Sequence, residues 1–138
     1  MRIVALPAFI SLALCGCQTT GGPHVIVPAN ATRQLDRFYS VAPDCSSLGR
    51  TSITVTEPPQ HGKVSVIYRD QLPSFPATFK LSACNKTPVE TTLVLYISDP
   101  GYLGDDSTSI TATFPNGQTK NVTYPIDVHP PGEPAATQ

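Results

Sequence analysis

Three carboxylates around a glycine-rich turn form the densest group of candidate ligand side chains in the sequence. Asp99, Asp105 and Asp106 lie close together, with Gly101 and Gly104 between them. Oxygen-rich loops of this kind can bind calcium. The spacing lacks the bidentate Glu of an EF-hand, however, and a turn Asp also bonds backbone amides or caps a strand. We favour the structural role and keep the three residues as weak calcium candidates.

His61 is the main candidate for acid–base chemistry. It lies in the turn sequence Pro-Pro-Gln-His-Gly, and no nucleophile motif of the Gly-x-Ser-x-Gly type accompanies it. The other two histidines, His24 and His129, fall near the ends of the chain, which does not favour a three-histidine metal site. The sequence therefore predicts neither an enzyme nor a cofactor, and we interpret His61 as a turn residue.

The first seventeen residues contain a chemical signal of another kind. One basic residue, Arg2, precedes an apolar run over residues 5–14. This run is far shorter than the roughly 20 residues that span a bilayer. It ends in Leu-Cys-Gly-Cys, which resembles the signal of a bacterial lipoprotein, with Cys17 as the acylated first residue of the mature chain. Gln18 follows instead of Asp, and by resemblance to enterobacterial sorting rules this favours the outer membrane, with the domain in the periplasm.

The remaining cysteines then predict a disulfide. Cys15 would leave with the signal and Cys17 would carry lipid, so Cys45 and Cys84 remain in an oxidising compartment. A bond between them would close a loop of about 40 residues and contribute on the order of 4 kcal/mol in the chain-entropy model. A metal site at this pair is disfavoured, because no His or second Cys lies at ligand spacing.

Composition narrows the class of protein. The chain has 138 residues, with 9 Lys and Arg against 10 Asp and Glu, and it lacks Trp. There is no basic stripe, which excludes nucleic acid as an expected partner. Fifteen prolines and many threonines, without long helical windows, favour short strands and turns.

We divide the chain into four parts. Residues 1–16 are the predicted signal peptide, and residues 17–32 are a predicted flexible tether from the lipid. Residues 33–129 are the predicted domain, and residues 130–138 are a Pro-rich tail that we expect to be disordered.

The pattern of the central part predicts an all-β fold. Alternating or apolar runs indicate strands near residues 37–41, 51–56, 63–68, 91–98, 109–114 and 122–128. The nearly continuous apolar run at 91–98 is typical of a central strand covered on both faces. Asn116-Gly117 predicts a hairpin turn, and Pro125 favours an edge or a bulge. About seven short antiparallel strands with one disulfide describe an Ig-like β-sandwich.

Two turn sequences resemble a known family. Pro59-Gln60-His61-Gly62-Lys63-Val64 matches the Pro-x-His-Gly-x-Val element of bacterial Ig-like, cadherin-like repeat domains. The segment from Tyr96 to Ser107 is similar to the family's Tyr-x-Pro-x-x-Gly-Tyr/Phe-x-Gly-x-Asp-Ser segment, without gaps. The resemblance covers roughly residues 50–128 and implies a β-sandwich used for spacing, adhesion or scaffolding, without catalysis.

The chain departs from the family at three points. Ser98 replaces the usual Pro, and Thr108 replaces the aromatic residue that usually follows Asp-Ser. The stretch between Val64 and Tyr96 is also much longer than the usual hairpin and contains Cys84. We interpret residues 69–90 as an insertion that the disulfide would fasten to the Cys45 segment.

These observations favour a lipid-anchored, non-enzymatic envelope protein that acts as a binding or structural accessory to another envelope protein. One alternative is a carbohydrate- or peptidoglycan-binding module, for which Tyr68, Phe75 and Phe79 are the candidate aromatic surface. Tyr102 would be a contact at a loop tip, or pack beneath that loop. A small protease inhibitor that uses the 69–90 loop is the other alternative.

Overall fold

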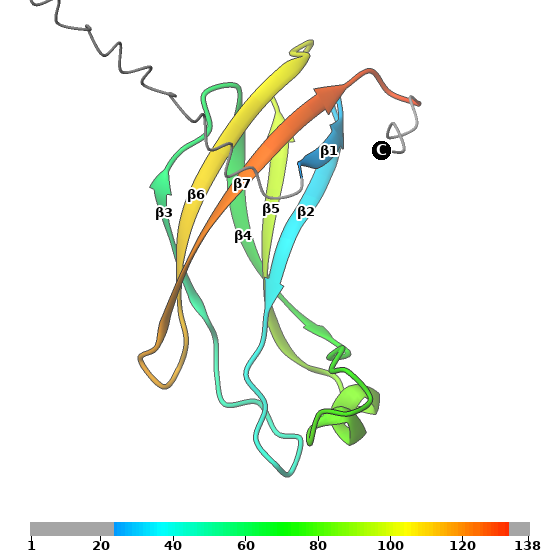
Figure 1. Cartoon of the computed structure of the whole chain (residues 1–138), viewed down its shortest axis with the longest axis vertical. Helices are drawn as coiled ribbons and strands as arrows, with labels where there is room; N and C mark the ends of the chain where they lie inside the picture. The colour runs from blue at the N-terminus through cyan, green and yellow to red at the C-terminus, as the bar shows by residue number, and fades with distance from the viewer. Residues whose placement is uncertain (1–23, 133–138) are drawn as a thin grey trace, which may run out of the picture.

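The computed structural model describes residues 24–132, so Cys17, the predicted signal peptide and most of the predicted tail lie outside the described residues. Figure 1 shows an elongated sandwich of two β-sheets with loops gathered at its two ends. The elements are β1 (Val25–Pro28), β2 (Thr32–Phe38), β3 (Ser52–Glu57), β4 (Gly62–Gln71), the 3₁₀-helix η1 (Ser82–Lys86), β5 (Val89–Ser98), β6 (Gly104–Thr113) and β7 (Thr119–His129). The predicted all-β sandwich is confirmed.

The connections place different kinds of loop at the two ends of the sandwich. Sheet A has the order β1-β7-β6-β3, and sheet B has the order β2-β5-β4. The turns at 29–31, 58–61 and 99–103 lie at one end, which we call the turn end (Figure 1). The loop 39–51, the insertion and the hairpin turn 114–118 lie at the other, which we call the loop end. The insertion comprises residues 72–88 and not the predicted 69–90, because the outer residues of that range belong to β4 and β5.

The core lies between the sheets and uses every second residue of the long strands. The buried cluster includes Val94 and Tyr96 of β5, Ile110 and Ala112 of β6, and Ile126 and Val128 of β7, each at most 2% exposed. All six have even numbers. Because successive side chains of a strand point to opposite faces, the odd-numbered residues of β4 to β7 face outward.

The first strand lies inside the segment that we predicted to be a tether, residues 17–32. β1 pairs with β7 from Val25 opposite Ile126 to Pro28 opposite His129, and Val27 is fully buried in the core. The tether prediction is therefore wrong for β1 and for Thr32, which begins β2. The β1–β7 pair is parallel, unlike the other strand pairs and unlike our prediction.

Pro125 lies in a strand that has neighbours on both sides, because β7 runs between β1 and β6. The hairpin bond from the Phe114 N–H to the Gln118 carbonyl fixes which residues bond across β6 and β7. The alternation of an antiparallel ladder then turns the nitrogen of Pro125 away from β6. Pairing with β1 begins one residue later, at Ile126. The missing N–H therefore disrupts neither ladder.

Sheet B follows the sequence prediction in its centre and departs from it at its edge. β5 is the central strand, as the apolar run at 91–98 indicated. β2 begins at Thr32 and ends at Phe38, whereas we expected a strand near residues 37–41. The residues after Phe38 instead form part of the loop end.

Candidate functional site

At the turn end, Asp106 joins the two sequence segments that carry the family resemblance. Its Oδ1 accepts hydrogen bonds from the backbone N–H groups of Gln60 at 3.0 Å and Ser107 at 2.8 Å. Its Oδ2 accepts from the backbone N–H of His61 at 3.0 Å and from the Tyr96 hydroxyl at 2.8 Å. One carboxylate therefore ties β6 to the turn before β4 and to the central strand of the opposite sheet.

The protonation states of this pair suit a structural link. Burial opposes ionisation of Asp106, but its four hydrogen bonds outweigh this and hold the pKa below the ordinary value of 3.8. Burial also raises the pKa of Tyr96, and the bond to Asp106 raises it further. At neutral pH the pair is therefore an ionised acceptor with a protonated donor.

Close packing surrounds the turn beside Asp106. A Cβ on Gly62 would lie 2.5 Å from Cε2 of Tyr96 and 2.6 Å from the Ile97 carbonyl oxygen, so only glycine fits. The His61 ring stacks on Tyr102 with centroids 4.0 Å apart and planes 7° apart. Tyr102, a candidate contact residue, is thus partly buried by its own loop system, and His61 lies beside the turn.

The three carboxylates of this end do not form a metal site. Within residues 24–132, no group of three or more His, Cys, Asp or Glu side chains is placed to hold a metal ion. The candidates Asp99, Asp105 and Asp106 do not converge, and Asp106 uses both oxygens in the bonds above. A depression of about 250 Å³ beside them is lined by Gln60, His61, Asp105, Asp106 and Ser107.

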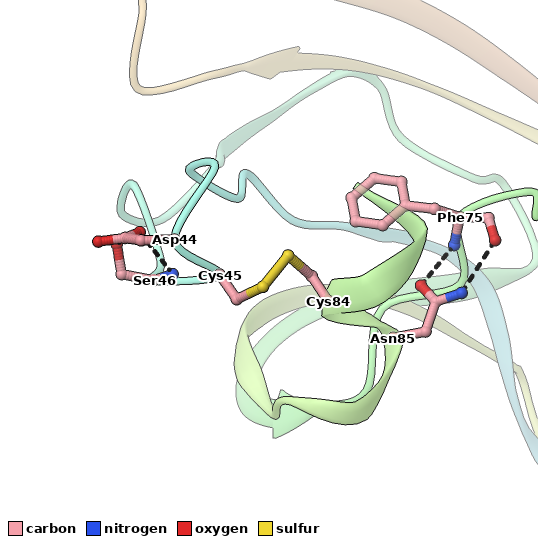
Figure 2. Close-up of a disulfide and its surroundings, with 6 residues drawn as sticks. All are labelled: Asp44, Cys45, Ser46, Phe75, Cys84 and Asn85. Carbon is pink, nitrogen blue, oxygen red and sulfur yellow. Dashed lines mark hydrogen bonds between the residues drawn. A yellow bond between two sulfur atoms is a disulfide. The ribbon is translucent and has the colours of Figure 1, made fainter. Parts of the chain in front are cut away.

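At the loop end, Cys45 and Cys84 form the predicted disulfide, with an S–S distance of 2.05 Å and Cα atoms 5.1 Å apart (Figure 2). The bond joins the loop 39–51 to η1 and so to the insertion 72–88. Cys84 is 1% exposed and packs with Val41 and Val89, with Phe75 and other insertion residues beside them. The disulfide therefore lies at the centre of a second, smaller core.

Cys45 stands in a turn whose form recurs in the β6–β7 hairpin. In both Ala42–Ser46 and Phe114–Gln118, the first N–H donates to the fifth carbonyl and the fourth N–H donates to the first carbonyl. The fourth residue has a positive φ in each, 67° for Cys45 and 83° for Gly117. Only the second turn is apparent from the sequence, because Cys occupies the glycine position of the first.

Side chains of the insertion fix its backbone. The Asn85 amide pairs with the backbone of Phe75, accepting from its N–H and donating to its carbonyl, both at 2.9 Å (Figure 2). The Tyr39 hydroxyl accepts from the Ser74 N–H at 3.0 Å. The Phe75 ring meets Tyr39 edge-on and stacks on Phe79, with centroids 5.4 Å and 5.2 Å away.

The aromatic residues predicted as a binding surface do not lie together. Phe75 and Phe79 belong to the insertion, on the outward side of sheet B with Val89. Tyr68 lies opposite Thr92, at a position of β4 whose alternation places it on the side of sheet B that faces sheet A. The Arg50 guanidinium lies 4.4 Å from the Tyr68 ring centroid and also bonds Glu90. Tyr102 lies at the opposite end of the sandwich. The structure therefore separates the four candidates into three places.

The outward face of sheet B has an apolar stripe that sequence reasoning did not single out. It consists of Leu93, Leu95 and Ile97 of β5, with Ile67 of β4 opposite Leu93. The outward residues of β5 are fully buried as far as Leu93, and their burial then decreases toward the turn end. Val89 is 3% exposed and Leu93 is 2% exposed, Leu95 is intermediate, and Ile97 is 39% exposed. The second core covers the strand only at its loop end.

Basic side chains flank this stripe. Lys63 lies opposite Ile97, Arg37 lies opposite Leu93, and Arg69 is two residues from Ile67 on β4. The outward positions of the three strands hold these three cations and no carboxylate. The outward positions are Thr32, Gln34 and Arg37 of β2; Lys63, Ser65, Ile67, Arg69 and Gln71 of β4; and Val89, Thr91, Leu93, Leu95 and Ile97 of β5. The two ion pairs found in residues 24–132 involve Arg50 and His129, so none of the three cations is neutralised by a carboxylate.

The outward face of sheet A is polar, in contrast to the apolar stripe on sheet B. β6 and β7 carry mainly Ser, Thr and Asn there, and several of these side chains bond across strands. Ser109 contacts Thr123 at 2.8 Å, and the Thr111 hydroxyl donates to Asn121 at 2.7 Å. Ser109 also bonds the Glu57 carboxylate of β3 at 2.7 Å. This face is therefore hydrophilic and satisfies many of its own hydrogen bonds.

Comparison of the chain with protein-family models, with curated proteins and with solved structures finds no match. Within residues 24–132, no helix has the length and apolar character needed to span a membrane.

Proposed function

We propose that this chain is an exported, lipid-anchored binding protein without enzymatic activity, which serves as an accessory to another envelope protein. The proposal combines the Leu-Cys-Gly-Cys signal with a disulfide that needs an oxidising compartment. The resemblance to cadherin-like repeat domains supports a role in scaffolding or adhesion. The anchor would sit in the outer membrane, with the domain in the periplasm.

The observation that carries the binding role is the uncovered half of the outward face of sheet B. An apolar strand that is buried on both faces at one end and exposed on one face at the other is suited to packing against a further layer. A lipid anchor strengthens such a contact, because it confines both partners to one surface and raises their effective concentration.

The anchor is tested by the fractionation of two single-cysteine variants in the cells that make the protein. In a Cys17→Ser protein we expect loss of the mature membrane-bound species, with soluble protein or unprocessed precursor in its place. Cys15→Ser is the matched control, because Cys15 leaves with the signal, and it should fractionate like the unchanged protein. A mature-sized Cys17→Ser species that remains in the membrane fraction would contradict the proposal.

A further inference from the structure

We propose that the less buried end of the apolar stripe, Leu95 and Ile97 of β5 with Ile67 of β4, binds a segment of another protein whose apolar side chains are flanked by carboxylates. The proposal rests on the binding role above and names the surface and the chemistry of its partner. From Ile67, opposite Leu93, to Ile97 this surface spans roughly 14 Å along the strands, at about 3.4 Å per residue. A short extended segment or about two and a half turns of a helix would cover it.

Burial along β5 argues that the exposed half of the stripe is a binding surface. The outward residues Val89, Thr91 and Leu93 are each at most 3% exposed, so one end of this row already forms core. Leu95 and Ile97 continue the same row with side chains of the same kind, but outside the second core. A partner seated there would extend an existing apolar surface.

Charge selects the kind of partner. Lys63 lies opposite Ile97, and Arg37 and Arg69 lie near Leu93 and Ile67, with no carboxylate at the outward positions of these strands. Carboxylates on the partner would meet all three cations at the rim of the contact, which favours correct pairing and speeds association.

The same charges argue against a second copy of this chain. Two copies joined through this face would bring Lys63, Arg37 and Arg69 against the same cations of the partner copy. The outward face of sheet A carries the carboxylates Glu57, Asp105 and Asp127, but it presents hydroxyl groups where the stripe needs apolar ones. Packing against Leu95 and Ile97 would take those hydroxyls out of water and give the apolar side chains a polar surface.

The proposal is tested in native cells by photocrosslinking of the full chain, with benzoylphenylalanine placed at residue 97. The matched control places the same group at residue 123, an exposed outward position on sheet A. We expect a protein adduct from residue 97 alone, and sequencing of the crosslinked peptide should show apolar residues flanked by Asp or Glu. Reversal of the two exposed cations, Lys63→Glu with Arg69→Glu, should lower the adduct yield about tenfold, whereas Lys63→Arg should preserve it.

Each other result would overturn the proposal. A crosslinked peptide from this chain would indicate self-association, and a lipid adduct would indicate contact with the membrane. Equal yields from residues 97 and 123, or a yield unchanged by charge reversal, would show that the stripe selects no such partner. The Cys17→Ser fractionation is independent of all these results, so failure of the anchor and failure of the binding face can be told apart.

Discussion

The outward face of β5 is covered at one end and uncovered at the other, although its side chains keep the same character. At the loop end, the chain supplies its own cover, formed by the insertion and the 39–51 loop and fastened by Cys45–Cys84. At the turn end, the equivalent polar links, centred on Asp106, hold the two sheets together but leave the outward face bare. The two ends therefore differ in cover, and under the proposed binding role the loop end stabilises the domain while the turn end offers the contact surface.

Of the changes considered, removal of the disulfide should alter the stability of the loop end most. Cys45 and Cys84 are 39 residues apart, and the chain-entropy model gives about 4 kcal/mol for such a loop. We expect urea unfolding of the Cys45→Ser/Cys84→Ser protein to show a loss near that size. Hydrogen exchange should rise more around Val89 than around Tyr96, because Val89 loses its local cover in addition to the global stability that both sites lose. An equal increase of hydrogen exchange around Val89 and Tyr96 would show that the disulfide does not act mainly on the loop end.

The control for this experiment comes from the repeated turn. Because Cys45 occupies the position of Gly117, the Cys45→Gly/Cys84→Ser protein loses the cross-link but gains a residue suited to positive φ. It should be more stable than the serine variant by about 1 kcal/mol. If the two variants unfold at the same urea concentration, the positive φ at residue 45 makes no measurable contribution to stability.

Truncation at the two ends of the same outward row should give unequal costs. Val89→Ala removes a buried side chain and should cost about 2 to 3 kcal/mol of unfolding free energy. Ile97→Ala deletes more atoms, but from an exposed position, and should cost less than about 1 kcal/mol in the purified protein. Thermal unfolding of the two variants measures both losses of stability. A larger loss for Ile97→Ala than for Val89→Ala would show that the exposed end of the row stabilises the fold.

Asp106→Asn should have a smaller effect that depends on pH. Because the folded pKa lies below the unfolded value of about 3.9, the ionised carboxylate stabilises the protein above that value. This contribution is lost as the pH falls through the folded pKa. We expect a deficit of about 1 to 2 kcal/mol at pH 7 that shrinks below pH 4. A deficit that is constant from pH 7 to pH 3 would show that charge has no part in the link.

The sequence predicted the features that depend on local pattern. Alternation and apolar runs located the β-sandwich and the central strand β5, and elimination among four cysteines located the disulfide. It did not locate β1, because four residues with two inward valines leave little pattern among glycines and prolines. The sequence also did not show that the aromatic candidates lie apart, because their positions depend on strand register and on the fold of the insertion. Tyr68, 47% exposed, stands on β4 opposite Thr92, whereas Phe75 belongs to the insertion.

The proposed binding face was also hidden in the sequence, because its exposure depends on the arrangement of distant segments. An apolar run at 91–98 predicts burial on both faces, but it does not tell how far the cover extends. Only the three-dimensional structure shows that Leu95 is partly covered and Ile97 exposed, because the second core includes neither residue. Likewise, Arg37, Lys63 and Arg69 are scattered along the chain and become one basic rim only through the pairing of β2, β5 and β4.

Side-chain footprinting of the unmodified protein is the most direct test of whether a partner covers the apolar stripe in cells. Ile97 is 39% exposed on sheet B, and Val55, at the far edge of sheet A, is 37% exposed, so hydroxyl radicals should oxidise both in the purified protein. In intact cells the account predicts that oxidation of Ile97 falls severalfold relative to Val55, because a partner covers the stripe. An unchanged ratio of Ile97 to Val55 oxidation between cells and purified protein would contradict it.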